Sequence, residues 1–344
     1  MIQPFLLDLV GFFSKAVIIV IAFAVVVAIA VAARSGKGKK SEGELKVRSL
    51  NEFYQKLHDA VAGILLSKAD LKLLEKGKSK EAKQVKKQGL ASTNRQKVFV
   101  LDFKGDIRAS GVDALRHEVT AVLGHAKPTD EIVVRLESPG GSVDGYGLAS
   151  SQLVRIRDAG IPLTICVDNV AASGGYMMAC LGNKVLCAPF AILGSVGVVS
   201  SSPNFNRLLK KHDIDFEQVT AGEYKRTLTL FGENTEDARE KYREEINAIH
   251  ALFKGFVGKY RPVLNMDVVA TGEAWFGADA LERKLADELK TSDEYLQEKV
   301  ASADLIHLQF QKPKKGDMKA RLVGASADII ELLFARLSKR PIGF

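Results

Sequence analysis

The feature that most constrains this chain is an uncharged stretch near its amino terminus, residues 16–33. It is 18 residues long, and 11 of these are Val, Ile or Phe. A helix of that length measures about 27 Å at ~1.5 Å per residue, close to the ~30 Å hydrocarbon thickness of a bilayer. The stretch therefore predicts a single-pass transmembrane anchor within residues 1–33.

A cleaved secretory signal is the alternative, because Ala30-Val31-Ala32 is similar to a cleavage site. The apolar run exceeds the usual ~7–15 residues and no basic cluster precedes it, which favours an uncleaved anchor. Basic residues follow the run directly: Arg34, Lys37, Lys39 and Lys40. The positive-inside rule then places the body of the protein in the cytoplasm.

The basic charge of the chain is concentrated just after this anchor. Residues 34–97 hold 17 Lys or Arg against 7 Asp or Glu, a balance of +10, whereas the whole chain carries +8. Apolar residues at helical spacing predict an amphipathic juxtamembrane helix within 45–74, which can pack on the body, on a partner helix or on anionic lipid. Residues 75–97 are typical of a solvated helix tail or linker. Aromatic stacking residues are missing from the segment, so no nucleic-acid partner is expected.

Cofactor chemistry has no support in the sequence. The chain has three cysteines, without C-x-x-C spacing, and they are interpreted as small buried hydrophobes. Neither a G-x-G-x-x-G fingerprint nor a P-loop nor H-E-x-x-H occurs. We therefore expect no metal, nucleotide or other cofactor.

Short apolar strands alternate with helices over residues 98–310. The predicted strands are 98–103, 132–136, 163–167, 184–188 and 216–220. The predicted helices are 112–123, 143–159, 172–181, 203–212 and 236–260. This alternation indicates an α/β domain with largely buried parallel strands.

Three motifs follow predicted strands, where α/β folds place their functional sites. They are Ser138-Pro139-Gly140-Gly141-Ser142, Ala171-Ala172-Ser173-Gly174-Gly175 and Gly222-Glu223-Tyr224-Lys225-Arg226. The glycines of the first allow the backbone to approach a ligand, and the second sets a serine at a helix start. Each also fits a plain structural role: a strand-to-helix turn, a helix cap and a surface turn. Taken singly, none decides between the two interpretations.

Together these motifs resemble the signal peptide peptidase A family of membrane serine proteases. The resemblance is strongest over "LESPGGSV", "VDNVAASGGYMMAC", "ILGSVGVVS" and "TAGEYKRTL", and extends to the anchor and the basic leader. It implies a ClpP/crotonase-like fold, a spiral of β-β-α units, behind an N-terminal transmembrane helix and a basic helical segment. It also implies a bacterial inner-membrane location, peptide substrates and a ring-like homo-oligomer.

The resemblance also assigns roles to single residues. Ser173 is the expected nucleophile and Lys225 the expected general base of a Ser-Lys dyad. Ser195 orients the lysine, and the backbone N–H groups of Gly140 and Gly174 form the oxyanion hole.

A lysine acts as a base only when it is neutral, and its unperturbed pKa is ~10.4. Burial favours the neutral form. We therefore expect Lys225 to be buried, without a carboxylate partner, and within hydrogen-bond reach of Ser173. A Ser-His-Asp triad using one of the six histidines is the alternative, although none of them lies in a motif.

The sequence thus predicts a membrane-anchored serine endopeptidase that hydrolyses remnant signal peptides or unfolded membrane-derived segments. The alternatives are a crotonase-like thioester enzyme and a non-catalytic membrane scaffold. Trp275 and Phe276 are expected in the core or between subunits. Residues 311–344 are expected to form a linker and an amphipathic helix that packs between subunits.

Overall fold

The computed structural model describes residues 15, 43–67, 69–70, 76 and 95–311. One compact unit covers Leu45–Phe310, and the two ends of the chain form a second. The predicted anchor, most of residues 68–94 and the predicted C-terminal helix lie outside the described residues. Among the helices that are described, none combines the length and the apolar character needed to cross a membrane.

The centre of the unit is a sheet of seven described strands, of which β10 to β9 run parallel in the order given below. Its strands are apolar on both faces: in β2, Phe99 and Leu101 join one core cluster, and Val98 and Val100 join the other. Such double burial explains why the strands are continuous apolar runs rather than alternating patterns. In sheet order the strands are β1 (Glu44–Ser49), β10 (Ala303–Gln311), β2 (Gln96–Lys104), β3 (Glu131–Glu137), β4 (Leu163–Val167), β6 (Lys184–Cys187) and β9 (Glu288–Leu289).

A second, smaller sheet continues the chain beyond the carboxyl ends of β4 and β6. β5 pairs with β7 in parallel, and β7 pairs with β8 antiparallel. Ser138, just after β3, makes an isolated parallel bridge to Ala171 of β5. The small sheet therefore lies at the edge where the strands of the main sheet end. Its strands are β5 (Val170–Ala172), β7 (Ile192–Gly194) and β8 (Ala274–Phe276).

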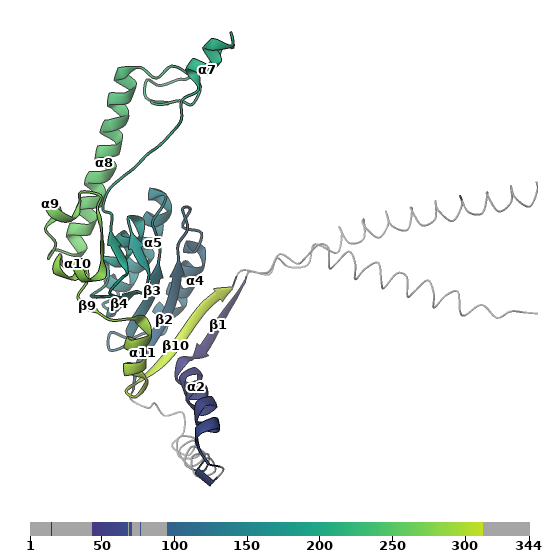
Figure 1. Cartoon of the computed structure of the whole chain (residues 1–344), viewed down its shortest axis with the longest axis vertical. Coiled ribbons are helices and arrows are strands. Elements are labelled where there is room, and N and C mark those ends of the chain that lie inside the picture. The colour runs from purple at the N-terminus through teal and green to yellow at the C-terminus, as the bar shows by residue number, and fades with distance from the viewer. Residues whose placement is uncertain (1–14, 16–42, 68, 71–75, 77–94, 312–344) are drawn as a thin grey trace, which may run out of the picture. The chain divides into compact units, whose positions relative to one another are not determined.

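Helices cover both faces of the main sheet (Figure 1). The larger core cluster takes side chains from α4, α5, α6, α8 and α10, whereas α2 and α11 pack on the opposite face. The described helices are α2 (Leu50–Leu65), α4 (Val112–Leu123), α5 (Val143–Asp158), α6 (Gly174–Ala179), α7 (Asn206–Lys211), α8 (Glu236–Tyr260), α9 (Met266–Val269), α10 (Gly277–Glu282) and α11 (Ser292–Val300).

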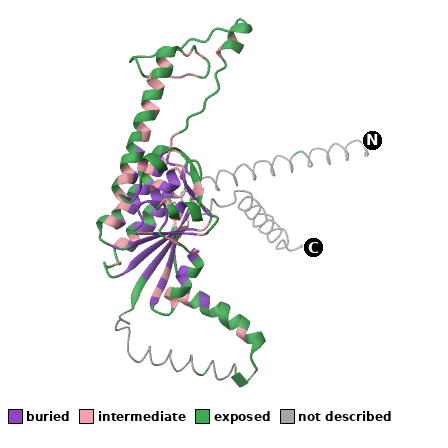
Figure 2. Cartoon of the chain, turned by 60° about the vertical axis from the view of Figure 1, so that its left-hand side comes forward, coloured by how far each residue is buried: buried purple, intermediate pink, exposed green. Residues whose placement is uncertain are grey.

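A long excursion between β7 and α8, residues 199–235, leaves the body of the unit; we call it the arm. It contains α7 and stands beside the amino-terminal half of α8 (Figure 1). Its residues are mostly exposed, whereas buried residues concentrate in the sheet (Figure 2). Aromatic rings hold it together internally, since Phe231 contacts Phe205 and Phe216 at 6.0 and 5.6 Å between centroids. α8 begins at Thr235, whose hydroxyl accepts the Ala238 N–H.

The parallel α/β architecture is confirmed, but two predicted elements are wrong. Residues 216–220 form no strand, because Phe216 packs on Phe231 inside the arm, where the described residues offer no neighbouring strand. Residues 45–49 are strand β1 rather than helix, because Leu45 and Val47 alternate with polar residues and join the sheet edge beside β10. Helical spacing holds only from Leu50 onward.

Glu118 on α4 is a buried carboxyl, 2% exposed. Its Oε1 accepts the Phe310 N–H at 2.7 Å, and its Oε2 finds no hydrogen-bond partner among the described residues. Burial raises the pKa of Glu118 from 4.5 to about 7; the Phe310 N–H opposes the rise and Asp102 adds to it. A native pKa above the unfolded value favours folding below pH 4.5, and that stability is lost as the pH rises to about 7.

We therefore expect Glu118→Gln to stabilise the protein at pH 8 by on the order of 1–3 kcal/mol, and hardly at all at pH 5. Glutamine stays neutral, and its carbonyl oxygen can still accept the Phe310 N–H. Denaturant unfolding at the two pH values measures the difference, with the exposed Glu282→Gln as the control. An equal shift at both pH values would show that the carboxyl of Glu118 does not titrate with folding.

Candidate active site

Ser173 occupies a sharp turn between strand β5 and helix α6. Its φ of 52° and ψ of −120° lie in a region that residues with a Cβ rarely adopt. The Ser173 N–H donates to Gly194 O at 2.8 Å, which pins the turn to β7. The side chain is half-buried and makes no hydrogen bond to the start of α6. The serine is therefore not a helix cap, and the strained turn holds its hydroxyl at the end of a strand as in a nucleophile elbow.

The first glycine motif packs directly against this turn. Gly140 has a φ of +91°, and a Cβ on it would lie 2.7 Å from both Ala172 O and Ser173 Cβ. A Cβ on Gly174 would lie 2.4 Å from Tyr146 Cγ, and one on Gly175 would lie 2.5 Å from Ser138 O. The glycines of both motifs are thus required where α6, α5 and the loop after β3 come together.

Two backbone N–H groups near Ser173 match those predicted for an oxyanion hole. Gly174 is the first residue of α6, so its N–H has no acceptor within the helix. The N–H of Gly140 donates to Ser138 Oγ at 3.1 Å. Gly140 therefore lies beside the serine, but its N–H is engaged with a neighbouring side chain.

Tyr146, on α5, completes a hydrogen-bonded chain behind the loop. Its hydroxyl donates to Asp106 O at 2.9 Å, so it accepts the hydrogen bond of 2.5 Å from Ser138 Oγ. Ser138 Oγ in turn accepts the Gly140 N–H. Sequence reasoning missed this role of Tyr146, because a single tyrosine on a helix is not distinguished from a core residue. Its ring is fully buried.

Ser195 lies beside Ser173. Ala172 pairs with Gly194 in the parallel β5–β7 ladder, so the serines that follow these two residues leave the small sheet at the same edge. Ser195 also has a φ of 52°, and its N–H donates to Glu273 O. The predicted nucleophile and the predicted orienting residue are therefore on adjacent strand ends.

Lys225 is not brought to these serines within the chain. It lies in the arm and its side chain is exposed, so the expected burial is not met. Among the described residues, no hydrogen bond or ion pair involves its side chain, and the expected absence of a carboxylate partner holds within that part. The neighbouring Tyr224 ring is contacted by Lys241 Nζ of α8 at 4.9 Å. The motif around Lys225 is therefore held against the first turns of α8.

The histidines do not offer an alternative base. His250 places Nε2 3.2 Å from Val196 O, and a ring nitrogen facing a carbonyl must carry the proton. His307 is buried and bonds to Asp102 on β2. In the part of the chain that the structure describes, no histidine hydrogen-bonds to Ser173.

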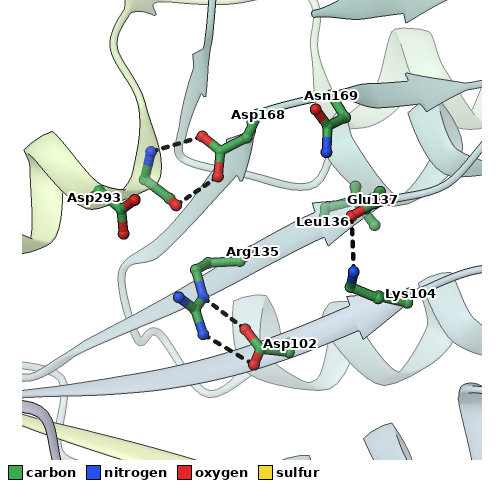
Figure 3. Close-up of a pocket in the computed structure, with 9 residues that line it drawn as sticks. Asp102, Lys104, Arg135, Leu136, Glu137, Asp168, Asn169 and Asp293 are labelled. Atoms are coloured by element: carbon green, nitrogen blue, oxygen red, sulfur yellow. Dashed lines mark hydrogen bonds and ion pairs between the residues drawn. The ribbon is translucent and has the colours of Figure 1, made fainter.

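A polar cavity of about 270 Å³ lies on the other face of the sheet, at the carboxyl ends of β2, β3 and β4 (Figure 3). Arg135 grips Asp102 with two bonds of 2.6 and 2.9 Å, and Lys104 pairs with Glu137. Burial raises the pKa of Asp102, but hydrogen bonds from His307 and Arg135 outweigh it and lower that pKa to about 2. Most charges of this cavity are thus paired with one another. Within the described ranges, no three His, Cys, Asp or Glu side chains are placed to hold a metal ion.

Comparison with known proteins identifies the class. The family described as "Peptidase family S49 N-terminal" matches residues 4–153, and "Peptidase family S49" matches residues 155–305. The chain therefore belongs to peptidase family S49, and it is a peptidase.

Its relatives within the family carry the description "Probable protease SohB", which the chain resembles over most of its length. It is 47% identical over 266 residues to the protein of Buchnera aphidicola subsp. Schlechtendalia chinensis, covering 75% of this chain and 87% of the relative. It is 45% identical over 281 residues to that of Haemophilus influenzae, covering 79% and 80%. With Buchnera aphidicola subsp. Acyrthosiphon pisum the identity is 54% over 226 residues, covering 66% and 67%.

Proposed function

We propose that the chain is a membrane-anchored serine endopeptidase with Ser173 as nucleophile and Lys225 as general base. The conformation of Ser173 is the observation that carries the proposal. Its hydroxyl is not used as a helix cap, and the backbone strain at φ 52° costs on the order of 1–3 kcal/mol. Strain of this kind is retained where a side chain must be presented in one direction. Family membership favours this function over both a thioester enzyme and a scaffold.

In the proposed reaction, Ser173 Oγ attacks the carbonyl carbon of a peptide bond while a neutral Lys225 amine takes its proton. The negative charge on the carbonyl oxygen is stabilised by the N–H groups of Gly174 and Gly140. For this, the Gly140 N–H must turn from Ser138 Oγ toward the substrate or be shared with it. The amine product then leaves with the proton from Lys225, and water hydrolyses the acyl-enzyme. Ser195 is close enough to Ser173 to orient the incoming amine.

We further propose that Lys225 reaches Ser173 across a contact between two copies of the chain. The arm projects from the body and exposes apolar residues, including Val219 at 97%. Contact with another copy would bury both these residues and the amine. Burial disfavours the ammonium form, which is what a lysine base requires. A ring-like homo-oligomer would supply this contact at every site.

The inferred substrates are extended peptides, such as remnant signal peptides or unfolded membrane-derived segments. A predicted anchor in the bacterial inner membrane would keep the enzyme near them. The order of a long strand, a short strand and a helix, as in β4, β5 and α6, supports the expected spiral of β-β-α units.

A serine-directed fluorophosphonate tests the nucleophile. Attack by Ser173 Oγ on phosphorus releases fluoride and leaves a stable adduct, which peptide mass spectrometry locates. We expect one adduct, on the peptide containing Ser173, together with loss of peptide cleavage. Cleavage that continues without an adduct, or inactivation with the adduct on another residue, would refute this assignment.

A further inference from the structure

We propose that α2 carries a membrane-binding surface that rests on an anionic bilayer. Five apolar side chains form one stripe of this helix, at spacings of three, four and one residue, and their exposed fractions run from 45% to 88%. We call this set the apolar stripe: Phe53, Leu57, Val61, Ile64 and Leu65.

Only the first turn of α2 packs on the body. Leu50 and Tyr54 are buried in the core cluster on that face of the sheet. The side-chain amide of Asn51 clamps the turn, donating to Ala303 O and accepting the Leu305 N–H. Beyond this turn the helix projects from the unit with almost all its residues exposed (Figures 1 and 2). The apolar stripe thus has no partner among the described residues.

The charge of the adjoining sequence selects the occupant. Between Lys68 and Lys97 there are ten Lys or Arg against three Asp or Glu. Anionic headgroups attract such a tract, adding to the insertion of an apolar helix face. A second copy docked through the same stripe would bring two such tracts together, and they would repel. The predicted transmembrane stretch also ends only ten residues before β1, which holds the bilayer close in sequence to α2.

This surface lies opposite the candidate active site. α2 is clamped at Ala303 and Leu305, where β10 begins, and the Ser173 turn follows the carboxyl ends of the parallel strands. With α2 on the bilayer, the Ser173 edge of the sheet is directed away from the lipid. The inference concerns a surface separate from the dyad, so each can fail without the other.

Site-directed nitroxide labelling of the full chain in lipid nanodiscs tests the proposal. The natural cysteines are fully buried, so a label attaches selectively to one introduced cysteine, and the unmutated chain reports the background. Leu57→Cys reports the apolar stripe. Asp59→Cys, about 200° around the helix, is the matched control on the polar side. In anionic phosphatidylglycerol discs we expect the ratio of oxygen to nickel-chelate accessibility to be at least about threefold higher at 57 than at 59.

Replacing the anionic lipid with phosphatidylcholine should remove most of that difference, because the basic tract then loses its attraction. Val61→Cys repeats the measurement one turn further on. Equal accessibility at positions 57 and 59 in anionic discs would overturn the proposal. So would a label at 57 that is shielded from both reagents and whose spectrum narrows when unlabelled chain is added, since that result identifies a second copy as the occupant.

Discussion

Replacing Ser173 by alanine should reduce peptide cleavage by about a thousandfold or more while the protein stays folded. The change removes only the hydroxyl, which makes no hydrogen bond to the start of α6, so the turn loses no structural contact there. The glycines that pack around the turn are unaffected. Initial rates on an unfolded peptide substrate and a thermal unfolding curve measure the two effects together.

Ser173→Gly separates the chemical role from the structural one. Glycine adopts a φ of 52° without strain, so this variant should be more stable than the wild type by about 1 kcal/mol and equally inactive. Ser151→Ala, at an exposed position on α5, is the control and should cleave at the wild-type rate. A Ser173→Ala variant that retains cleavage would exclude this residue as nucleophile.

Mixing two inactive variants should restore activity if Lys225 serves the Ser173 of another copy. Ser173→Ala and Lys225→Ala should each be inactive alone. Co-expressed at equal levels, they assemble at random, and a site is complete when its serine comes from the Lys225→Ala chain and its lysine from the other. This holds for about one site in four, so we expect about a quarter of wild-type activity.

Activity of the mixture is compared with that of each parent prepared alone at the same total concentration. Lys241→Ala provides a second comparison, because Lys241 contacts the Tyr224 ring beside the motif without belonging to the dyad. It should weaken cleavage far less than Lys225→Ala. A mixture no more active than its parents would mean that the arm closes over its own chain. A fully active Lys225→Ala variant would remove lysine from the mechanism.

The sequence predicted the strands that are buried on both faces and failed where burial is partial. Residues 163–167 match β4 at both ends, because a run of apolar residues between turn signals fits few other structures. The strands of the small sheet were missed, since three residues such as Val170–Ala172 hold too little pattern. Residues 216–220 have the alternation of a strand, but an arm outside the sheet gives them nothing to pair with.

The candidate site shows the same division. The motif could name Ser173, but the positive φ that separates a nucleophile from a helix cap is a property of the folded turn. Ser138 and Tyr146 act through a chain of hydrogen bonds between residues from different elements, which spacing along the sequence does not reveal. The exposure of Lys225 depends on the path of the arm, and no local pattern in the sequence encodes that path.

The burial of the cysteines has a consequence for the conditions in which the fold persists. Cys166, Cys180 and Cys187 are the three cysteines of the chain, and none of their side chains is exposed. Burial raises the pKa of all three thiols, to about 12 for Cys180 and about 11 for Cys187. Oxidants attack accessible thiolates, so these residues are protected in both respects. The body of the protein therefore tolerates a reducing cytoplasm and an oxidising periplasm equally, and a change of redox compartment would leave its core intact.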